Sequence, residues 1–273
     1  MNAHARLAPA LPLPLLRSED AGVVTLALDR PASRNALSDA MMAALQEALD
    51  AVAADRSVKA VVLAANGPAF SAGHDLKEVT ARRADPDSGT AYFADLFARC
   101  ARLMTTVVEL PQPVIAAVEG VATAAGCQLV ASCDLAVAGA DARFGTPGVN
   151  IGLFCSTPMV ALSRNVPRKR ALEMLLTGEA ISATTAKDIG LVNRVVTAGT
   201  ERDAAIALAR KVVLKSAHTV RIGKAAFYRQ AEMSLADAYR YAAEVMTENM
   251  LARDAEEGIG AFIEKRAPKW RDC

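Results

Sequence analysis

The chain has 273 residues, of which 52% are hydrophobic and 22% are charged, and this composition excludes a disordered or fibrous protein. Its 31 basic and 30 acidic residues leave a net charge of +1, so the overall charge favours neither nucleic acid nor an anionic membrane as a partner. No apolar run reaches the roughly 18 residues that a membrane-spanning helix needs, and we expect no membrane span.

The first two-thirds of the chain alternates predicted strands with predicted helices. Residues 1–17 contain prolines, which interrupt any helix, and no acidic residue, so we interpret them as a disordered or targeting tail. Apolar, β-branched runs predict strands at residues 23–29, 59–65, 114–118 and 134–138. Helical spacing of apolar residues predicts helices at residues 41–54 and 92–110, with Ser38 as the N-cap of the first. This alternation predicts βαβ units and an α/β fold.

The last third of the chain is almost wholly helical in its pattern. Helices are predicted at residues 200–215, 217–230 and 234–252. A shorter helix before them begins at the N-cap Ser182 and ends at Gly190. We therefore divide the chain into a core, residues 18–200, and a C-terminal helical region, residues 201–273, which forms a trailing layer or an oligomer interface.

The cysteines and glycines exclude two common kinds of site. The five cysteines form no CxxC pair and have no histidine at metal-ligand spacing, so we expect reduced, buried thiols and no metal. No GxGxxG follows the first predicted strand, which excludes a Rossmann dinucleotide site.

Two segments of small residues each follow a predicted strand. They are FSAGHDL at residues 70–76 and GVATAAGCQ at residues 120–128. Each leads to a turn or helix N-terminus, where backbone N–H groups have no partner within the helix. Two such donors that converge on one oxygen form an oxyanion hole. Either segment alone is also explained as a tight strand-to-helix connection that needs glycine for its backbone.

Several segments match, in order and spacing, the patterns of one known family. They are RPASRNAL, FSAGHDLKE, PVIAAVEGVATAAGCQLVASCDLAVA, LTGEAISATTAKDIGLVNRVV and IEKRAPKW. The third resembles the pattern P-[VT]-I-A-A-[VI]-x-G-x-A-x-G-G-G-x-E-[LM] of the crotonase superfamily, the enoyl-CoA hydratase/isomerase family. The stretch TPGVNIGLFCSTP is similar to one subgroup in particular.

This resemblance implies a crotonase-like spiral of ββα repeats with a C-terminal helical trimerisation region. It implies a homotrimer, or a hexamer built from two trimers. The implied partner is an acyl-CoA thioester, with coenzyme A as part of the substrate and no separate cofactor. The implied location is the cytoplasm of a bacterium or the mitochondrial matrix of a eukaryote.

The resemblance also assigns site residues by position. The oxyanion donors would be the backbone N–H groups of His74 and Ala125. The predicted coenzyme A contacts are Arg34, Ala36, Ala72, Lys77 and Lys265. Lys265 belongs to a basic cluster with Arg266 and Lys269 that would meet the phosphates of coenzyme A, those bound by a neighbouring subunit if not by its own. The alternative for these cations is a solvated side chain that complements a helix dipole.

Both glutamates that the family's hydratases use are missing. Their positions hold Gln128, which does not titrate near neutral pH, and Gly148, which has no side chain. Each lost acid–base group typically costs about 10²–10⁴ in rate, so we do not expect efficient hydration of a double bond. Glutamate at both positions is expected to restore some hydration if the rest of the pocket is intact. Ser156 stands where some relatives place a catalytic aspartate; it can position water but does not ionise.

Three other side chains near these positions carry alternatives. The His74 imidazole is either an acid–base group or a side chain turned outward or bonded to Asp75 or a backbone carbonyl. Cys127 and Cys155 are either nucleophilic thiolates or buried, inert thiols. Asp75 is interpreted as a helix cap.

Three functions remain open from the sequence. The first is an enzyme of altered chemistry on acyl-CoA, an isomerase, hydrolase or lyase that uses the oxyanion hole. The second is a non-catalytic, acyl-CoA-binding or regulatory oligomer. The third is an ordinary enoyl-CoA hydratase, against which Gln128 and Gly148 argue.

Overall fold

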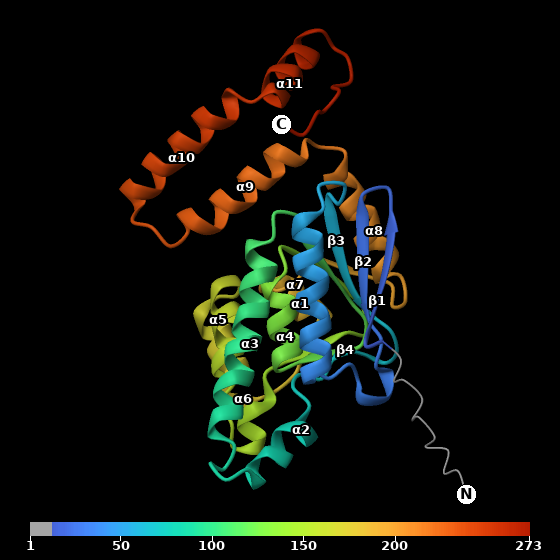
Figure 1. Cartoon of the computed structure of the whole chain (residues 1–273), viewed down its shortest axis with the longest axis vertical. Helices are drawn as coiled ribbons and strands as arrows, with labels where there is room; N and C mark the ends of the chain where they lie inside the picture. Colours follow the sequence, from blue (N-terminus) through green and yellow to red (C-terminus); the bar gives the residue numbers. More distant parts are fainter. Residues whose placement is uncertain (1–12) are drawn as a thin grey trace, which may run out of the picture.

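The computed structural model describes residues 13–273 as a layered core of strands and helices with a set of C-terminal helices extending from one end (Figure 1). The α/β fold expected from the alternation is confirmed. No helix in residues 13–273 is long and apolar enough to cross a membrane.

Two sheets carry the core. The larger has the order β1-β2-β3-β5-β7-β10, in which β1 is antiparallel to β2 and the remaining pairs are parallel. Its strands are Leu15–Asp20, Val23–Leu28, Ala60–Ala65, Val114–Val118, Leu135–Gly139 and Arg194–Val196. The smaller has the order β4-β6-β8-β9, formed by Ala69–Ser71, Val121–Thr123, Arg143–Gly145 and Ile181–Ser182.

The chain alternates between these sheets in a repeating way. β3, β5 and β7 lie in the larger sheet, and each is followed by a short strand of the smaller one, β4, β6 and β8 in turn. A helix follows each pair: α2 (Leu76–Ala81) and α3 (Thr90–Glu109), then α4 (Ala125–Ser132), then α5 (Ser156–Asn165). These are the predicted ββα repeats, and they bring the ends of β4 and β6 next to each other.

Helices cover both faces of the larger sheet. Side chains alternate along β3, so that Val61, Leu63 and Ala65 face α1 (Asp39–Ala54), α3 and α4, while Ala60, Val62 and Ala64 face α8 (Glu201–Val213). Ala205 and Ala209 of α8 are fully buried against that second face. We had assigned α8 to the C-terminal helical region, but this packing makes it part of the core.

The helix ends follow the predicted capping residues. The Ser38 hydroxyl accepts a hydrogen bond from the Met41 N–H, and the Ser182 hydroxyl accepts one from the Thr185 N–H. Gly190 follows α7 (Ala183–Asp188) with φ +87°, a left-handed backbone that suits glycine. The remaining short helices are α6 (Arg168–Thr177) and the 3₁₀ segments Pro31–Ser33, Arg82–Ala84 and Pro147–Ile151.

Among the elements that were not predicted, two lie near the ends of the described chain. β1 begins at Leu15, inside the range 1–17 that we interpreted as a tail, because it is an edge strand whose charged residues face solvent and show no apolar alternation. Residues 1–12 lie outside the described part of the chain. The other of these two is α11 (Arg253–Ile263), in which Gly258 and Gly260 lower the helical propensity.

A buried ion pair fastens the C-terminal helices to the core. α9 (Ala217–Gln230) and α10 (Leu235–Met250) pack as a pair, and α9 carries Lys224, only 8% exposed. The Lys224 ammonium lies 2.8 Å from the Asp134 carboxylate, which also accepts hydrogen bonds from the Tyr228 hydroxyl and the Val114 N–H. These contacts give Asp134 a structural role.

Replacing Lys224 with methionine should therefore destabilise the fold strongly, because it leaves the Asp134 carboxylate buried without its cation. We expect a loss of about 3–5 kcal/mol in the free energy of unfolding, measured by urea denaturation. Lys211→Met on the exposed surface of α8 is the matched control, with an expected change within about 0.5 kcal/mol. Equal stability of the two variants would contradict this role for the pair.

Candidate functional site

The two small-residue turns meet. β4 and β6 pair in parallel, with Ser71 opposite Ala122, so the segments that follow them leave the sheet together. A Cβ atom at Gly126 would lie 2.3 Å from the Ser71 carbonyl oxygen. A Cβ atom at Gly73 would lie 2.9 Å from the Ala124 Cβ and 3.2 Å from the Ala125 nitrogen. The glycines are therefore required by contact between the turns, in addition to the φ of +87° at Gly73.

Two backbone N–H groups at this contact have no acceptor. The Leu37 N–H donates to the Gly73 carbonyl at 2.8 Å, and Leu37 and His74 form an isolated parallel bridge, which turns the His74 N–H away from Leu37. Ala125 is the first residue of α4, where an N–H has no partner within the helix. Within residues 13–273 neither N–H donates a hydrogen bond. Two backbone donors without acceptors mark this corner, where the two turns touch, as a candidate binding site.

Ala124 supplies a feature that the sequence analysis missed. Its φ of 49° and ψ of −120° are strained for any residue with a Cβ, at a cost of about 1–3 kcal/mol. The Ala124 N–H is held by the Gly145 carbonyl at 2.9 Å, so the unusual dihedrals turn the next peptide, which carries the Ala125 N–H, away from the sheet. The sequence did carry a sign of this unusual backbone conformation, because the family pattern has glycine at the position of Ala124.

Gln128 lies on α4, one turn after Ala125, and is 4% exposed. Its Oε1 faces the Cys100 thiol of α3 at 3.9 Å. Burial raises the pKa of Cys100 to about 11, so the thiol stays protonated and donates this weak hydrogen bond. Gln128 is thus held against α3 as a neutral group.

No side chain fits at Gly148. A Cβ atom there would lie 2.5 Å from the Leu153 carbonyl oxygen and 2.8 Å from the Cys155 sulfur. The loop is closed across this position by a hydrogen bond of 2.9 Å from the Leu153 N–H to the Gly148 carbonyl. The space around Gly148 is therefore already filled. Glutamate at both positions was expected to restore hydration only if the rest of the pocket is intact, and this condition is not met at Gly148.

The thiols and the serine near this loop do not form a nucleophilic group. Burial raises the pKa of Cys127 to about 12 and also raises that of Cys155. Both thiols are protonated near neutral pH, which favours the inert alternative. Ser156 is exposed, and its hydroxyl donates only to the Phe154 carbonyl at 3.4 Å.

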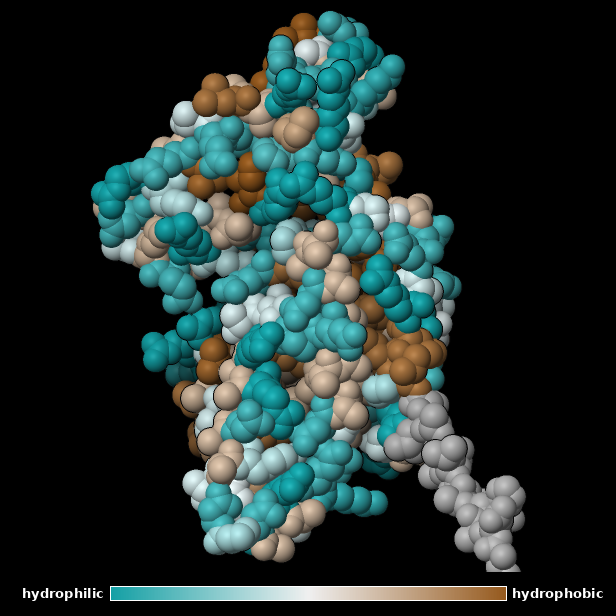
Figure 2. Space-filling view, in the orientation of Figure 1, coloured by the Kyte–Doolittle hydropathy of each residue, from teal (hydrophilic) through white to brown (hydrophobic). Residues whose placement is uncertain are grey.

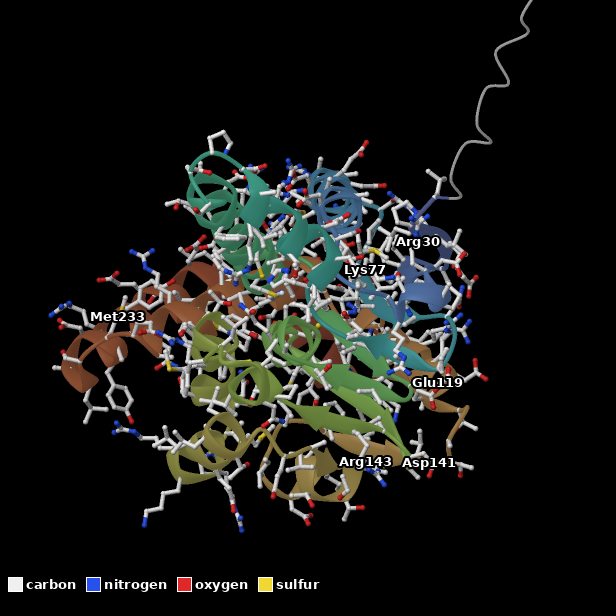
Figure 3. All side chains as sticks on the ribbon, turned by 90° about the horizontal axis from the view of Figure 1, so that it is seen from below. Arg30, Lys77, Glu119, Asp141, Arg143 and Met233 are labelled. Atoms are coloured by element: carbon white, nitrogen blue, oxygen red, sulfur yellow. The ribbon has the colours of Figure 1, made fainter. Side chains whose placement is uncertain are left out.

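Most of the predicted coenzyme A contacts border the same corner. The Arg34 carbonyl accepts a hydrogen bond of 3.0 Å from the Ala72 N–H, which joins the loop that contains Ala36 to the first small-residue turn. Lys77 is exposed on α2, and its backbone N–H is capped by Asp75 as expected. Figure 3 looks at this end of the molecule from below and labels Lys77 near the middle of the view.

Lys265 is not brought together with these residues. It follows α11, at the opposite end of the long axis from α2 (Figure 1). Its neighbour Arg266 is occupied by Glu257 and Glu264, and the Lys269 N–H donates to Glu257. Within one chain the basic cluster is therefore remote from Lys77 and does not border the same corner.

The His74 ring is not turned into solvent. Its Nδ1 lies 3.4 Å from the Leu37 carbonyl oxygen, the kind of backbone contact that one sequence alternative named. Its ring packs edge-to-face with Phe97 of α3, with centroids 5.9 Å apart. No group of three or more metal-ligating side chains occurs in the part of the chain that the structure describes.

Comparison with known proteins gives a consistent set of relatives. Residues 18–273 match the enoyl-CoA hydratase/isomerase family. The chain is 49% identical to a mitochondrial enoyl-CoA hydratase domain-containing protein 3 of Xenopus laevis over 95% of this chain and 86% of that protein. A crystal structure of an enoyl-CoA hydratase from Mycobacterium smegmatis is 57% identical, with a TM-score of 0.90 over 95% of this chain and 99% of that one. Human enoyl-CoA hydratase domain-containing protein 3 has a TM-score of 0.89 at 46% identity, over 94% of this chain and all of that one.

A methyl group at Gly73 tests the contact between the turns. Gly73→Ala should lose about 2–5 kcal/mol of unfolding free energy, because left-handed strain of about 1–2 kcal/mol adds to overpacking of about 1–3 kcal/mol. Gly199→Ala has nearly the same φ, +84°, but open space around its Cβ, and should show the strain alone. Urea denaturation of both variants measures the difference, and equal losses would show that the turns are not in close contact.

Proposed function

Because the chain belongs to the enoyl-CoA hydratase/isomerase family, in the subgroup of enoyl-CoA hydratase domain-containing protein 3, we propose that it binds acyl-CoA thioesters at the corner between the two turns. The thioester oxygen would accept hydrogen bonds from the N–H groups of His74 and Ala125. The single observation that carries this proposal is that both amides lack an acceptor at the contact between the turns. Such donors act when negative charge develops on that oxygen.

The proposed chemistry is not efficient hydration. Addition of water to a double bond needs one group to activate water and one to protonate carbon. Gln128 supplies no titratable group, and Gly148 has neither a side chain nor space for one. We propose an enzyme of altered chemistry, an isomerase, hydrolase or lyase acting on acyl-CoA. The second candidate is a non-catalytic, acyl-CoA-binding oligomer, which the same two positions favour.

Several relatives are named hydratases, among them a 2,3-dehydroadipyl-CoA hydratase of Escherichia coli at 34% identity over 94% of this chain and 98% of that protein. The names of the Xenopus and human relatives place those proteins in mitochondria. For this chain, the mitochondrial matrix or the bacterial cytoplasm stays a prediction.

We propose that the chain acts as a homotrimer or a hexamer. Large apolar side chains are exposed along the C-terminal helices, some of them visible as brown patches in the upper part of Figure 2. They are Phe227, Leu235, Tyr239, Met246, Met250, Leu251, Ile259, Phe262 and Ile263. Exposed apolar surface of this extent supports the proposed interface. A neighbouring subunit could also bring its own Lys265 to the ligand bound near Lys77.

Light scattering on the purified chain checks the assembly. We expect a mass three or six times that of the chain. Phe262→Ser, which removes a side chain that is 84% exposed, should weaken the assembly without destabilising the isolated subunit. A monomer at micromolar concentration would contradict the proposed interface.

The purified protein should bind acyl-CoA and fail to hydrate crotonyl-CoA at a rate near that of an authentic hydratase. We expect hydration slower by at least about 10²-fold, because acid–base groups are missing. Calorimetric titration with butyryl-CoA measures binding, and loss of the enoyl thioester absorbance measures hydration. Fast hydration would overturn the altered chemistry, and absence of binding would overturn the proposed function.

Glutamate variants serve as the control for this result. Gly148→Glu should unfold at a lower temperature than the wild type, because its Cβ meets the Leu153 carbonyl and the Cys155 sulfur. Gly223→Glu, at a position with nothing within 4 Å of the added Cβ, should unfold near the wild-type temperature. The double change Gln128→Glu/Gly148→Glu should therefore gain no hydration.

A further inference from the structure

The three C-terminal helices bury little apolar surface against the core. In the part of the chain that the structure describes, α10 has no buried residue, α9 has only Lys224, and α11 has only Asp254 and Ala261. Apolar packing therefore contributes little to the direction in which these helices leave the core (Figure 1). The Lys224 ion pair holds α9 at one point, and a single point of attachment does not fix a direction.

A returning segment, residues 265–273, provides a second attachment. Lys265 has a left-handed φ of 56°, at which the chain turns back after α11. The Arg266 guanidinium donates to both oxygens of the Glu257 carboxylate, at 2.6 and 2.9 Å, and the Lys269 N–H donates to the same carboxylate at 2.7 Å. The segment therefore runs back along α11 toward the beginning of that helix.

Trp270 holds the returning segment against two elements at once. Its indole N–H donates to the Leu214 carbonyl at 2.9 Å, in the connection between α8 and α9. Its ring lies on the backbone of α11 at Gly258, where an added Cβ would be 3.0 Å from the Cη2 atom and 3.1 Å from the Cζ3 atom. Glycine is unfavourable within a helix, and here this contact accounts for it.

Asp254 joins the returning segment to the beginning of α9. It lies in the first turn of α11 and is 2% exposed. Its carboxylate accepts hydrogen bonds from the Ser216 hydroxyl at 2.5 Å and from the N–H groups of Arg271 and Asp272 at 2.7 and 2.9 Å. The Ser216 hydroxyl is also the N-cap of α9, since it accepts the Thr219 N–H. One buried carboxylate thus binds α9, α11 and the returning segment together.

Asp272 extends this attachment to the core. One oxygen of its carboxylate accepts the N–H of Ala217, the first residue of α9, at 2.7 Å. The other oxygen lies 2.8 Å from the ammonium of Lys59, which directly precedes β3 of the larger sheet. The returning segment therefore contacts the core, α9 and α11, whose relative positions the Lys224 ion pair alone leaves open.

We propose that Trp270, Arg271 and Asp272 form a clasp that sets the direction of α9, α10 and α11, and that the chain assembles only while this clasp is closed. The inference rests on the proposed homotrimer or hexamer. A closed ring of subunits requires one fixed angle between the interface and the core. When the clasp is open, the helices are attached through Lys224 alone, and their exposed apolar side chains no longer form one surface of fixed direction.

Trp270 is the only tryptophan of the chain, so its fluorescence reports on the clasp directly. Gly258→Leu should displace the ring, because an added Cβ alone already lies 3.0 Å from it. We expect the emission to move to longer wavelength and acrylamide to quench it more strongly than in the wild type. Gly260→Leu, in the same helix but with nothing within 4 Å of the added Cβ, is the matched control and should keep the wild-type emission.

Light scattering on the same proteins tests whether assembly depends on the clasp. Gly258→Leu should have the mass of one chain at a concentration at which the wild type is assembled, while circular dichroism shows a folded core. Asp254→Asn, which adds no volume but places an amide among N–H and O–H donors, should change emission and mass in the same direction. Asp188→Asn, an exposed carboxylate at the end of α7, is its control and should stay assembled.

Each other result counts against a particular step. Wild-type emission in both Gly258→Leu and Asp254→Asn contradicts the clasp. Displaced emission with the wild-type mass overturns the link between clasp and assembly. Loss of the core fold in both variants contradicts a role confined to the C-terminal helices. A wild-type chain that is a monomer overturns the proposed assembly and this inference with it, whereas the proposed binding of acyl-CoA is tested separately by calorimetry.

Discussion

The close contact between the turn after β4 and the turn after β6 is the constraint on which the site depends. Parallel pairing of the two short strands brings the turns together, and Gly73 and Gly126 let their backbones touch. The contact places two amide donors at one corner, one from a loop and one from a helix N-terminus. Because the donors are backbone groups, their position is set by the sheet and not by any side chain, and the chemistry can change while the corner stays.

Helix α4, which carries the Ala125 donor, is held by contacts at both of its ends. α4 begins with Ala125 at the corner between the turns and ends just before Asp134, whose carboxylate is bound by Lys224 and Tyr228 of α9. The strain at Ala124 is tolerated because the Gly145 carbonyl holds its N–H and the Gly73 turn packs against it. Helix α4 thus links one of the two candidate oxyanion donors, Ala125, to the region that we propose as the subunit interface.

The sequence predicted the capping residues, because these depend on local patterns, and the resemblance to a known family implied the ββα repeats and the meeting of the two turns. It did not predict β1 or the place of α8, because edge pairing and the choice of a sheet face depend on the whole fold. It identified Gln128 and Gly148 as missing glutamates, but the crowding at Gly148 comes from residues 153 and 155, whose carbonyl and sulfur fold back over it. The surroundings of the His74 ring were likewise not predicted, since they come from the segment before α1 and from α3.

The filled space at Gly148 has a consequence for how this lineage can change. In an open loop, substitution of that residue alone would introduce a carboxylate. Here the Leu153 carbonyl and the Cys155 sulfur occupy the volume, so a carboxylate at position 148 also requires the loop to be rebuilt. Two coordinated changes are less accessible than one, so this chain is expected to diversify around the groups that remain.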